Sequence, residues 1–433
     1  MFLYHTPDQL RTCAASEAQS GQWHMAEQFA GQLLDTHPAD PTALNVMGRV
    51  AMHATRHAAA ARFFAAAMAA SPGFKPAKKN LALAEQAAAT APPVGAAPRY
   101  LLIREWGAGF WADVDHVLGQ VLLAEITGRI PIVHWGQGSR FGDRTSADNW
   151  TRFFEPVSAA TLADIQDRGL TCFPGKWNST PWNARVPNRW AGPDSRTTGL
   201  ATLASDAQVV VSDFFYSVAC ARAWIEPGHR LYGASLHTVY RDLLRTYARP
   251  SKAIVDAVDA FAAANFMPRP VMAVHFRGTD KHLETQPFGD LAGQYPAALD
   301  AMDRRLRPAR VFLMTDQQSA LDEFRALLGE RLIATDAFRA NSGRGIHFHN
   351  AVPGPQLGRE VLIDTLLATR ADAFVGFGPS NVSGMITLLR QWPVDHAALI
   401  GPSYLEWRRP GVYLCPPASE LDDEAPASTP APA

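Results

Sequence analysis

The feature that most constrains the fold of this chain is a short apolar run that ends in charged residues. Residues 271–281 read VMAVHFRGTDK, and the first half has the length and apolar character of a strand buried in a parallel sheet. The second half carries the polar side chains His275, Arg277, Asp280 and Lys281. Open α/β sheets bind ligands at the carboxyl ends of their strands, where such fixed positive charges suit a diphosphate. A polar loop with one salt bridge is the alternative interpretation.

The segments around this run alternate between strand and helix patterns. After it, helices are expected at 296–306, 319–328 and 358–368, strands at 310–316, 331–334 and 373–377, and a last helix from Ser380. Before it, the pattern predicts strands at 99–103, 130–134 and 208–213, a helix that ends near 126, and helical spacing over 236–264. This alternation is typical of doubly wound parallel sheets, with 268–270 as the hinge between two of them.

The length and net charge of the chain limit the number of domains and the classes of binding partner that it can have. A chain of 433 residues suggests two or three domains, and 40 basic against 41 acidic residues indicate no nonspecific binding to nucleic acid or anionic lipid. The four cysteines are widely spaced, which favours buried thiols over a zinc site or a disulfide framework: Cys13, Cys172, Cys220 and Cys415. No basic leader or long apolar run is present, so we expect a cytoplasmic protein without a membrane span.

The first part of the chain is alanine-rich and repeats itself. Pro38 and Pro72 are 34 residues apart, which is the tetratricopeptide period. In the second copy, small residues such as Gly48 let two helices approach while Phe64 fills the space between them. Such a module either docks a protein or a second subunit, or covers an apolar patch of the next domain. The predicted division is a helical module at 1–90, a linker at 91–98, Rossmann-like domains at 99–265 (acceptor side) and 266–415 (donor side), and a disordered tail at 416–433.

Three sequence blocks resemble motifs of the α1,6-fucosyltransferase and protein O-fucosyltransferase superfamily. The chain is similar to a bacterial member of that superfamily. The run from His275 to Lys281 is similar to the superfamily's H-x-R-R-T-D-K signature, and Thr315-Asp316 is similar to its T-D-D block. Asp364 with the run 377–383 (FGPSNVS) resembles the third block. The turn Gly107-Ala-Gly109 with His116 resembles the superfamily's amino-terminal glycine turn; taken alone, it is also typical of a tight turn without a ligand.

The resemblance implies a GT-B fold, in which two Rossmann-like domains face a cleft, and transfer of L-fucose from GDP-fucose with inversion. It implies that Arg277 binds the β-phosphate of the donor, and that His275 and Asp364 recognise guanine, whose N1–H and N2–H groups suit a carboxylate. It places Gly107, Gly109, His116, Lys281 and Asp316 at the donor site as well. Ser380 and Asn381 either bind phosphate at a helix N-terminus or simply cap that helix.

The catalytic base remains open between two carboxylates. Glu284 follows Lys281 one residue earlier than in the superfamily, and Asp280 is the other choice. Two positions depart from the pattern, since Gly278 replaces the second arginine and Gln317 the second aspartate. No D-x-D pair is present, so we expect no metal, and His347 and His349 are interpreted as structural loop residues.

The prediction is therefore a glycosyltransferase that moves a sugar, most simply L-fucose, from a GDP-sugar to a hydroxyl of a glycan or protein acceptor. Because helical repeats also precede two-Rossmann O-GlcNAc transferases, a UDP-GlcNAc enzyme is the second hypothesis. A noncatalytic scaffold with a decayed transferase part is the third, and Gly278 and Gln317 keep it open. Acceptor, oligomeric state and the partner of the repeats are not predicted by the sequence.

Overall fold

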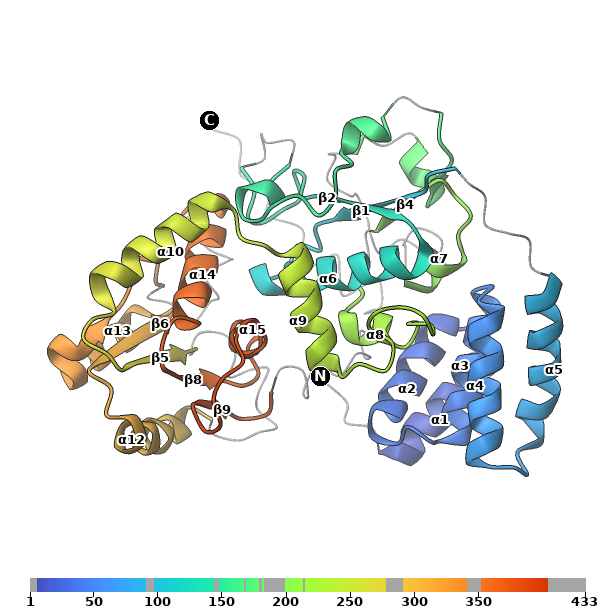
Figure 1. The fold of residues 1–433 in the computed structure, drawn as a ribbon, viewed down its shortest axis with the longest axis horizontal. Coiled ribbons are helices and arrows are strands. Elements are labelled where there is room, and N and C mark those ends of the chain that lie inside the picture. Colours follow the sequence, from blue (N-terminus) through green and yellow to red (C-terminus); the bar gives the residue numbers. More distant parts are fainter. Residues whose placement is uncertain are drawn as a thin grey trace, which may run out of the picture.

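The computed structural model describes residues 6–90, 97–143, 148–166, 169–178, 181–182, 199–212, 215–277, 291–340 and 352–403. Two parallel sheets are present, and an all-helical segment precedes them (Figure 1). The predicted fold class is confirmed in these terms. The predicted linker lies largely outside the described residues, as does the tail at 416–433.

The helical segment consists of five helices in sequence: α1 (Pro7–Gln19), α2 (Trp23–Thr36), α3 (Pro41–His53), α4 (His57–Ala70) and α5 (Lys75–Thr90). Side-chain caps mark the start of two of these helices. Thr6 and Gln9 form a capping box on α1, and the Asp40 side chain accepts a hydrogen bond from the Ala43 amide at the start of α3. Consecutive helices pack against each other, and we name α1–α5 the helical module.

Close approach within the module depends on Gly48 of α3. A Cβ atom added at Gly48 would lie 2.4 Å from Cε1 of Phe64, which is fully buried on α4. The sequence prediction that Phe64 fills the space over a small residue is confirmed by this contact.

We therefore expect Gly48→Ala to destabilise the protein by about 1–3 kcal/mol, because the new methyl group overpacks a filled interface. Gly31→Ala is the matched control: Gly31 lies inside α2, and a Cβ there meets nothing within 4 Å. That variant should gain about 0.5–1 kcal/mol, since alanine favours the helix. Denaturant unfolding of both variants measures the difference, and equal midpoints would contradict the packing argument.

The first sheet has the strand order β2-β1-β4-β3, all parallel, with β1 (Tyr100–Arg104), β2 (Ile130–His134), β3 (Cys172–Phe173) and β4 (Val209–Ser212). The long helix α6 (Phe110–Thr127) connects β1 to β2 and ends at Gly128, whose φ of 63° is left-handed. The short helices α7 (Gly199–Ala204) and α8 (Val218–Arg222) flank β4 in sequence. Strands β1, β2 and β4 were predicted, whereas β3, α7 and α8 were not.

The helical pattern at 236–264 divides into two helices, α9 (Leu236–Tyr247) and α10 (Lys252–Asn265). Pro250 lies between them, and its ring and missing N–H are incompatible with a helix interior. Helix α10 precedes the predicted hinge, yet it covers the second sheet: the rings of Phe261 and Phe312 on β6 are 6.0 Å apart. The Arg370 side chain also donates a 2.8 Å hydrogen bond to Asp259 of α10.

The second sheet has the order β7-β6-β5-β8-β9, again all parallel. Its strands are β5 (Val271–Phe276), β6 (Arg310–Thr315), β7 (Leu332–Ile333), β8 (Ala373–Phe377) and β9 (Ala397–Ile400). The helices of this half are α12 (Tyr295–Leu306), α13 (Gln318–Leu328), α14 (Gly354–Ala368) and α15 (Asn381–Leu389). All of them except β9 follow the predicted alternation.

The apolar run at the centre of the chain forms the middle strand of the second sheet. The five side chains from Val271 to His275 are buried, and β5 pairs with β6 on one side and β8 on the other. One apolar core lies on each face of the strand: Val271 and Ala273 belong to a core shared with the first sheet and the helical module, while Met272 and Val274 face the other. No helix among the described residues is long and apolar enough to cross a membrane.

Candidate functional site at the carboxyl edges of the two sheets

Each sheet changes its winding direction at one place. In the second sheet, β5 is followed by β6 and β7 on one side, and the chain then crosses to β8 and β9 on the other. In the first sheet, the corresponding place lies between β1 and β4. Loops leave in opposite directions at these points, which creates the crevice where open α/β sheets bind ligands.

His275 lies at the carboxyl end of β5, beside the crevice between β5 and β8. It is 6% exposed, and its Nδ1 lies 2.7 Å from Oγ of Ser383 on α15. Burial lowers the pKa of His275 to about 3, and the neighbouring Arg277 acts in the same direction. The ring is therefore neutral at physiological pH, so it can offer a hydrogen bond to a base but no positive charge to a phosphate.

Arg277 follows β5 directly and provides the positive charge that His275 lacks. Its side chain is 17% exposed, and Nε lies 3.6 Å from Oδ2 of Asp316, which follows β6. The two motifs that the sequence analysis singled out separately are thus neighbours at one sheet edge. A planar guanidinium held beside a carboxylate keeps a defined orientation, and it can bind two phosphate oxygens at once.

Asp364 lies on α14 at the side of the sheet where β7 ends. Its Oδ1 accepts a 2.7 Å hydrogen bond from the Thr335 hydroxyl, and burial raises the pKa of Asp364 to about 7. No hydrogen bond or ion pair links it to His275 or Arg277 in the part of the chain that the structure describes. Asp364 is thus a half-buried carboxylate that changes protonation near neutral pH.

Ser380 and Asn381 begin α15 immediately after β8. Ser380 occupies the N-cap position and is 1% exposed, but its hydroxyl makes no capping hydrogen bond to the helix. Ser380 is thus the N-cap residue of α15 by its backbone, while its hydroxyl does not cap the helix. The first amides of α15 lie at the carboxyl edge of β8, where a helix N-terminus can bind an anion.

The glycine turn of the first half has a different environment from the one expected of a free phosphate loop. Gly107 has φ of 85°, a left-handed conformation that explains the glycine there. Its amide and that of Ala108 donate hydrogen bonds of 3.1 and 2.8 Å to the Asp113 carboxylate on α6. A phosphate could bind these amides only by displacing Asp113. Gly109 is the N-cap of α6, and a donor-binding role for either glycine stays a prediction.

His116 is fully buried behind this turn. Its Nε2 lies 3.4 Å from the Ser212 hydroxyl at the end of β4, and its Nδ1 accepts a 3.4 Å hydrogen bond from the Tyr216 amide. With 0% exposure, the ring supports the turn from within instead of lining an open surface. A direct contact with a donor, as the resemblance implies, would require the surrounding side chains to move.

The two halves meet directly at helix α14. The Trp111 indole on α6 donates a 2.8 Å hydrogen bond to the Thr365 hydroxyl, one residue after Asp364. Gly358 faces the ring of Phe153: an added Cβ would lie 2.7 Å from its Cζ. Side chains of the first half therefore fix the helix that carries Asp364.

Several residues singled out from the sequence lie outside the described residues: Asp280, Lys281, Glu284, His347 and His349. Their predicted roles stay predictions. Within the described ranges, no group of three or more His, Cys, Asp and Glu side chains could hold a metal ion. Cys13, Cys172 and Cys220 are free thiols.

Sequence reasoning missed three side chains that hold the predicted site residues. Ser383 contacts His275, the Tyr295 hydroxyl donates a 2.6 Å hydrogen bond to the His275 carbonyl, and Thr335 contacts Asp364. Ser383 lies inside the third block, three residues after Ser380, so helical spacing from Ser380 could have found it. No signal near Tyr295 or Thr335 connects them with residues 20 and 29 positions away.

Comparison with solved structures returns fucosyltransferases. The α1,6-fucosyltransferase NodZ co-crystallised with GDP has 19% sequence identity and a TM-score of 0.44, and the match covers 68% of this chain and 92% of that one. NodZ from Bradyrhizobium has 20% identity and a TM-score of 0.44 over 68% and 93% of the two chains. POFUT1 in complex with GDP-fucose has 13% identity and a TM-score of 0.45 over 72% and 100%.

Similarity of this degree does not assign an activity to the chain. No protein-family model matches it. No curated protein matches it either.

Proposed function

We propose that this protein is an inverting glycosyltransferase that uses a GDP-sugar, most simply GDP-fucose, and transfers the sugar to a hydroxyl of a glycan or protein acceptor. The observation that carries the proposal is the position of His275 and Arg277. Both lie at the carboxyl end of the central strand β5, at the winding change of the second sheet, with α15 starting beside them. Residues of three sequence blocks, which together extend over about a hundred residues, lie at the carboxyl ends of this sheet.

The proposed chemistry assigns one role to each charge. Arg277 and the first amides of α15 bind the diphosphate and stabilise the negative charge that grows as GDP leaves. The acceptor hydroxyl attacks the anomeric carbon from the face opposite to GDP, so the new bond has inverted configuration. Glu284 or Asp280 takes the proton of that hydroxyl. No step requires a metal ion.

Base recognition is assigned to Asp364 and His275. A carboxylate accepts the N1–H and N2–H donors of guanine, whereas uracil presents a carbonyl oxygen on either side of its N3–H group. Two carbonyls facing an aspartate are unfavourable, so Asp364 favours GDP over UDP. The UDP-GlcNAc hypothesis remains the second candidate because a helical module also precedes the two sheets here.

Turnover separates these proposals from the noncatalytic hypothesis. The full-length protein is incubated with GDP-fucose, UDP-GlcNAc and a mixed library of glycans and peptides, and free GDP and UDP are quantified. We expect GDP release from GDP-fucose, and faster release when a suitable acceptor is present. Absence of turnover with either donor, despite nucleotide binding, would support a noncatalytic scaffold.

A further inference from the structure

The helical module is attached to the first half through a buried carboxylate. Glu27 of α2 is 3% exposed, and its Oε1 accepts hydrogen bonds from the Tyr216 hydroxyl and, at 2.7 Å, from the Trp224 indole. Its other oxygen lies 3.8 Å from Nδ1 of His24. Burial and then the charge of Glu27 hold the pKa of Tyr216 well above its usual value, so the phenol remains a donor. A buried carboxylate with two donors is a strong and specific contact.

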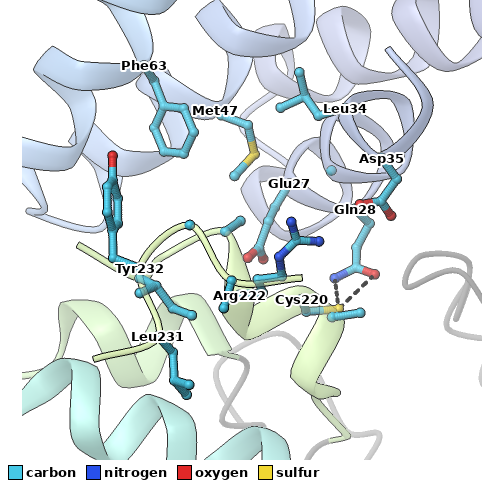
Figure 2. A pocket seen from close by; sticks show the side chains of 16 residues that line it. Glu27, Gln28, Leu34, Asp35, Met47, Phe63, Cys220, Arg222, Leu231 and Tyr232 are labelled. Carbon is cyan, nitrogen blue, oxygen red and sulfur yellow. Dashed lines mark hydrogen bonds between the residues drawn. The ribbon is translucent and has the colours of Figure 1, made fainter. Parts of the chain in front are cut away.

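Glu27 is the centre of a wider contact that leaves a cavity. Figure 2 shows Glu27 and Gln28 of α2 facing Cys220 and Arg222 of α8, with Met47 and Phe63 on the module side. The cavity between them has a volume of about 290 Å³. A second contact joins the module to the first half, because Arg56, which precedes α4, forms a 2.6 Å ion pair with Glu226. The module surface formed by α2 and α4 is thus engaged with the same chain.

The segment that Glu27 holds lies at the winding change of the first sheet. Residues 215–217 follow β4, and their backbone rests on α6, where a Cβ added at Gly119 would lie 2.0 Å from the Tyr216 carbonyl oxygen. The backbone of residues 215–217 therefore lies directly against the backbone of α6, with no space for a side chain at position 119. A shift of Tyr216 is therefore transmitted to α6.

From this segment, an aromatic contact leads to the glycine turn. The rings of Phe215 and His116 are stacked with centroids 6.0 Å apart, and Trp106 lies 5.8 Å from Phe215. Trp106 directly precedes Gly107. Contacts therefore run without interruption from α2 of the module to the turn between β1 and α6.

We propose that Glu27 is a positioning residue: through Tyr216 it fixes residues 215–217 and the aromatic side chains beneath the glycine turn. On this account, the helical module is a structural part of the ligand-binding edge of the first half. The effect on donor binding rests on the proposed function, whereas the effect on the backbone does not. The cavity plays no part in it.

The test compares three full-length variants. Glu27→Ala removes the acceptor, Glu27→Gln keeps an oxygen that can accept both hydrogen bonds, and Arg56→Ala removes a contact of the module that does not involve Tyr216. Amide hydrogen exchange of residues 215–217 and 106–112 is measured without nucleotide. We expect exchange about tenfold faster in Glu27→Ala, and less than about twofold faster in the other two variants.

Kinetics with GDP-fucose provide a readout that simple destabilisation does not change. Loss of folded protein lowers the apparent kcat at constant KM, whereas a displaced turn raises KM. We expect KM to rise about fivefold to tenfold in Glu27→Ala and to return in Glu27→Gln. If Glu27→Ala does not fold, Tyr216→Phe removes one of the two donors and carries the same test.

Unchanged exchange at 215–217 in Glu27→Ala, or in Tyr216→Phe where that variant is used, would overturn the proposal. Equal acceleration in Arg56→Ala would also overturn it, since any loosening of the module would then have the same effect. Faster exchange in Glu27→Ala together with no GDP-fucose turnover by the wild type would support the positioning role and reject the proposed function.

Discussion

Arg277→Ala should lower the rate of sugar transfer by about 10²–10³ while the protein stays folded. Arg277 directly follows the central strand β5 and lies beside Asp316. In the proposed mechanism its charge is needed most when GDP leaves. The residue is largely buried beside Asp316, so a modest loss of stability is expected as well. Initial rates of GDP release and the unfolding midpoint are measured on the same preparations.

Two further variants test whether sugar transfer depends on the charge of Arg277 alone and whether loss of an arginine elsewhere has the same effect. Arg277→Lys keeps the charge but loses the planar fork, so we expect it to recover only part of the rate. Arg304→Ala is the control, because this α12 side chain is 73% exposed and forms an ion pair with Asp300 one turn away. If Arg277→Ala transfers sugar at the wild-type rate, Arg277 does not belong to the catalytic site.

Asp364→Asn should weaken GDP binding and, at the same time, stabilise the protein above neutral pH. In the proposed function the carboxylate accepts two guanine donors, and loss of hydrogen bonds to a charged acceptor costs about 1.5–3 kcal/mol, or tenfold to a hundredfold in Kd. The amide keeps the oxygen that accepts from Thr335, so the local structure is preserved. Calorimetry with GDP and thermal unfolding at several pH values measure the two effects.

The pH dependence follows from the raised pKa of Asp364, which is about 7 because of burial. If only the carboxylate binds guanine, GDP affinity of the wild type rises about tenfold from pH 6 to pH 8, and the variant loses this dependence. The stability of the folded protein changes with pH in the opposite direction to GDP affinity. A carboxyl whose folded pKa exceeds its unfolded pKa destabilises the fold as the pH rises from the unfolded value towards 7.

Asp364→Asn should therefore unfold at a higher temperature than the wild type at pH 8, and at nearly the same temperature at pH 4. Asp259→Asn is a suitable control, since Asp259 is a 58% exposed aspartate on α10, outside the site. If the variant binds GDP as tightly as the wild type at pH 8, Asp364 does not recognise the base.

Regular local patterns made much of the fold predictable from the sequence. Strand β5 could be predicted because a short, mostly apolar run follows Pro270, and the helical module because an alanine-rich pattern repeats after 34 residues. Strands β3 and β9 could not, since β3 has two residues and β9 is only partly buried. Such strands exist because a neighbouring strand already supplies hydrogen bonds.

The charged residues of the candidate site could be predicted from the sequence. The side chains that hold them in place could not. His275, Arg277 and Asp316 come together because parallel strands deliver their carboxyl ends to one edge, which the alternation of strands and helices implies. The contact of Asp113 with the glycine turn and the burial of His116 depend on how α6 packs, and no spacing rule contains that information. The attachment of the module through Glu27 joins residues 189 positions apart.

Calorimetric titration of the full-length protein with GDP and with UDP at pH 8 is the most direct test of the central claim. The account predicts that GDP binds at least about tenfold more tightly than UDP, because Asp364 is ionised at that pH and matches the donors of guanine alone. Equal affinity, or tighter binding of UDP, would contradict a GDP-sugar site at the edge formed by β5 and β8.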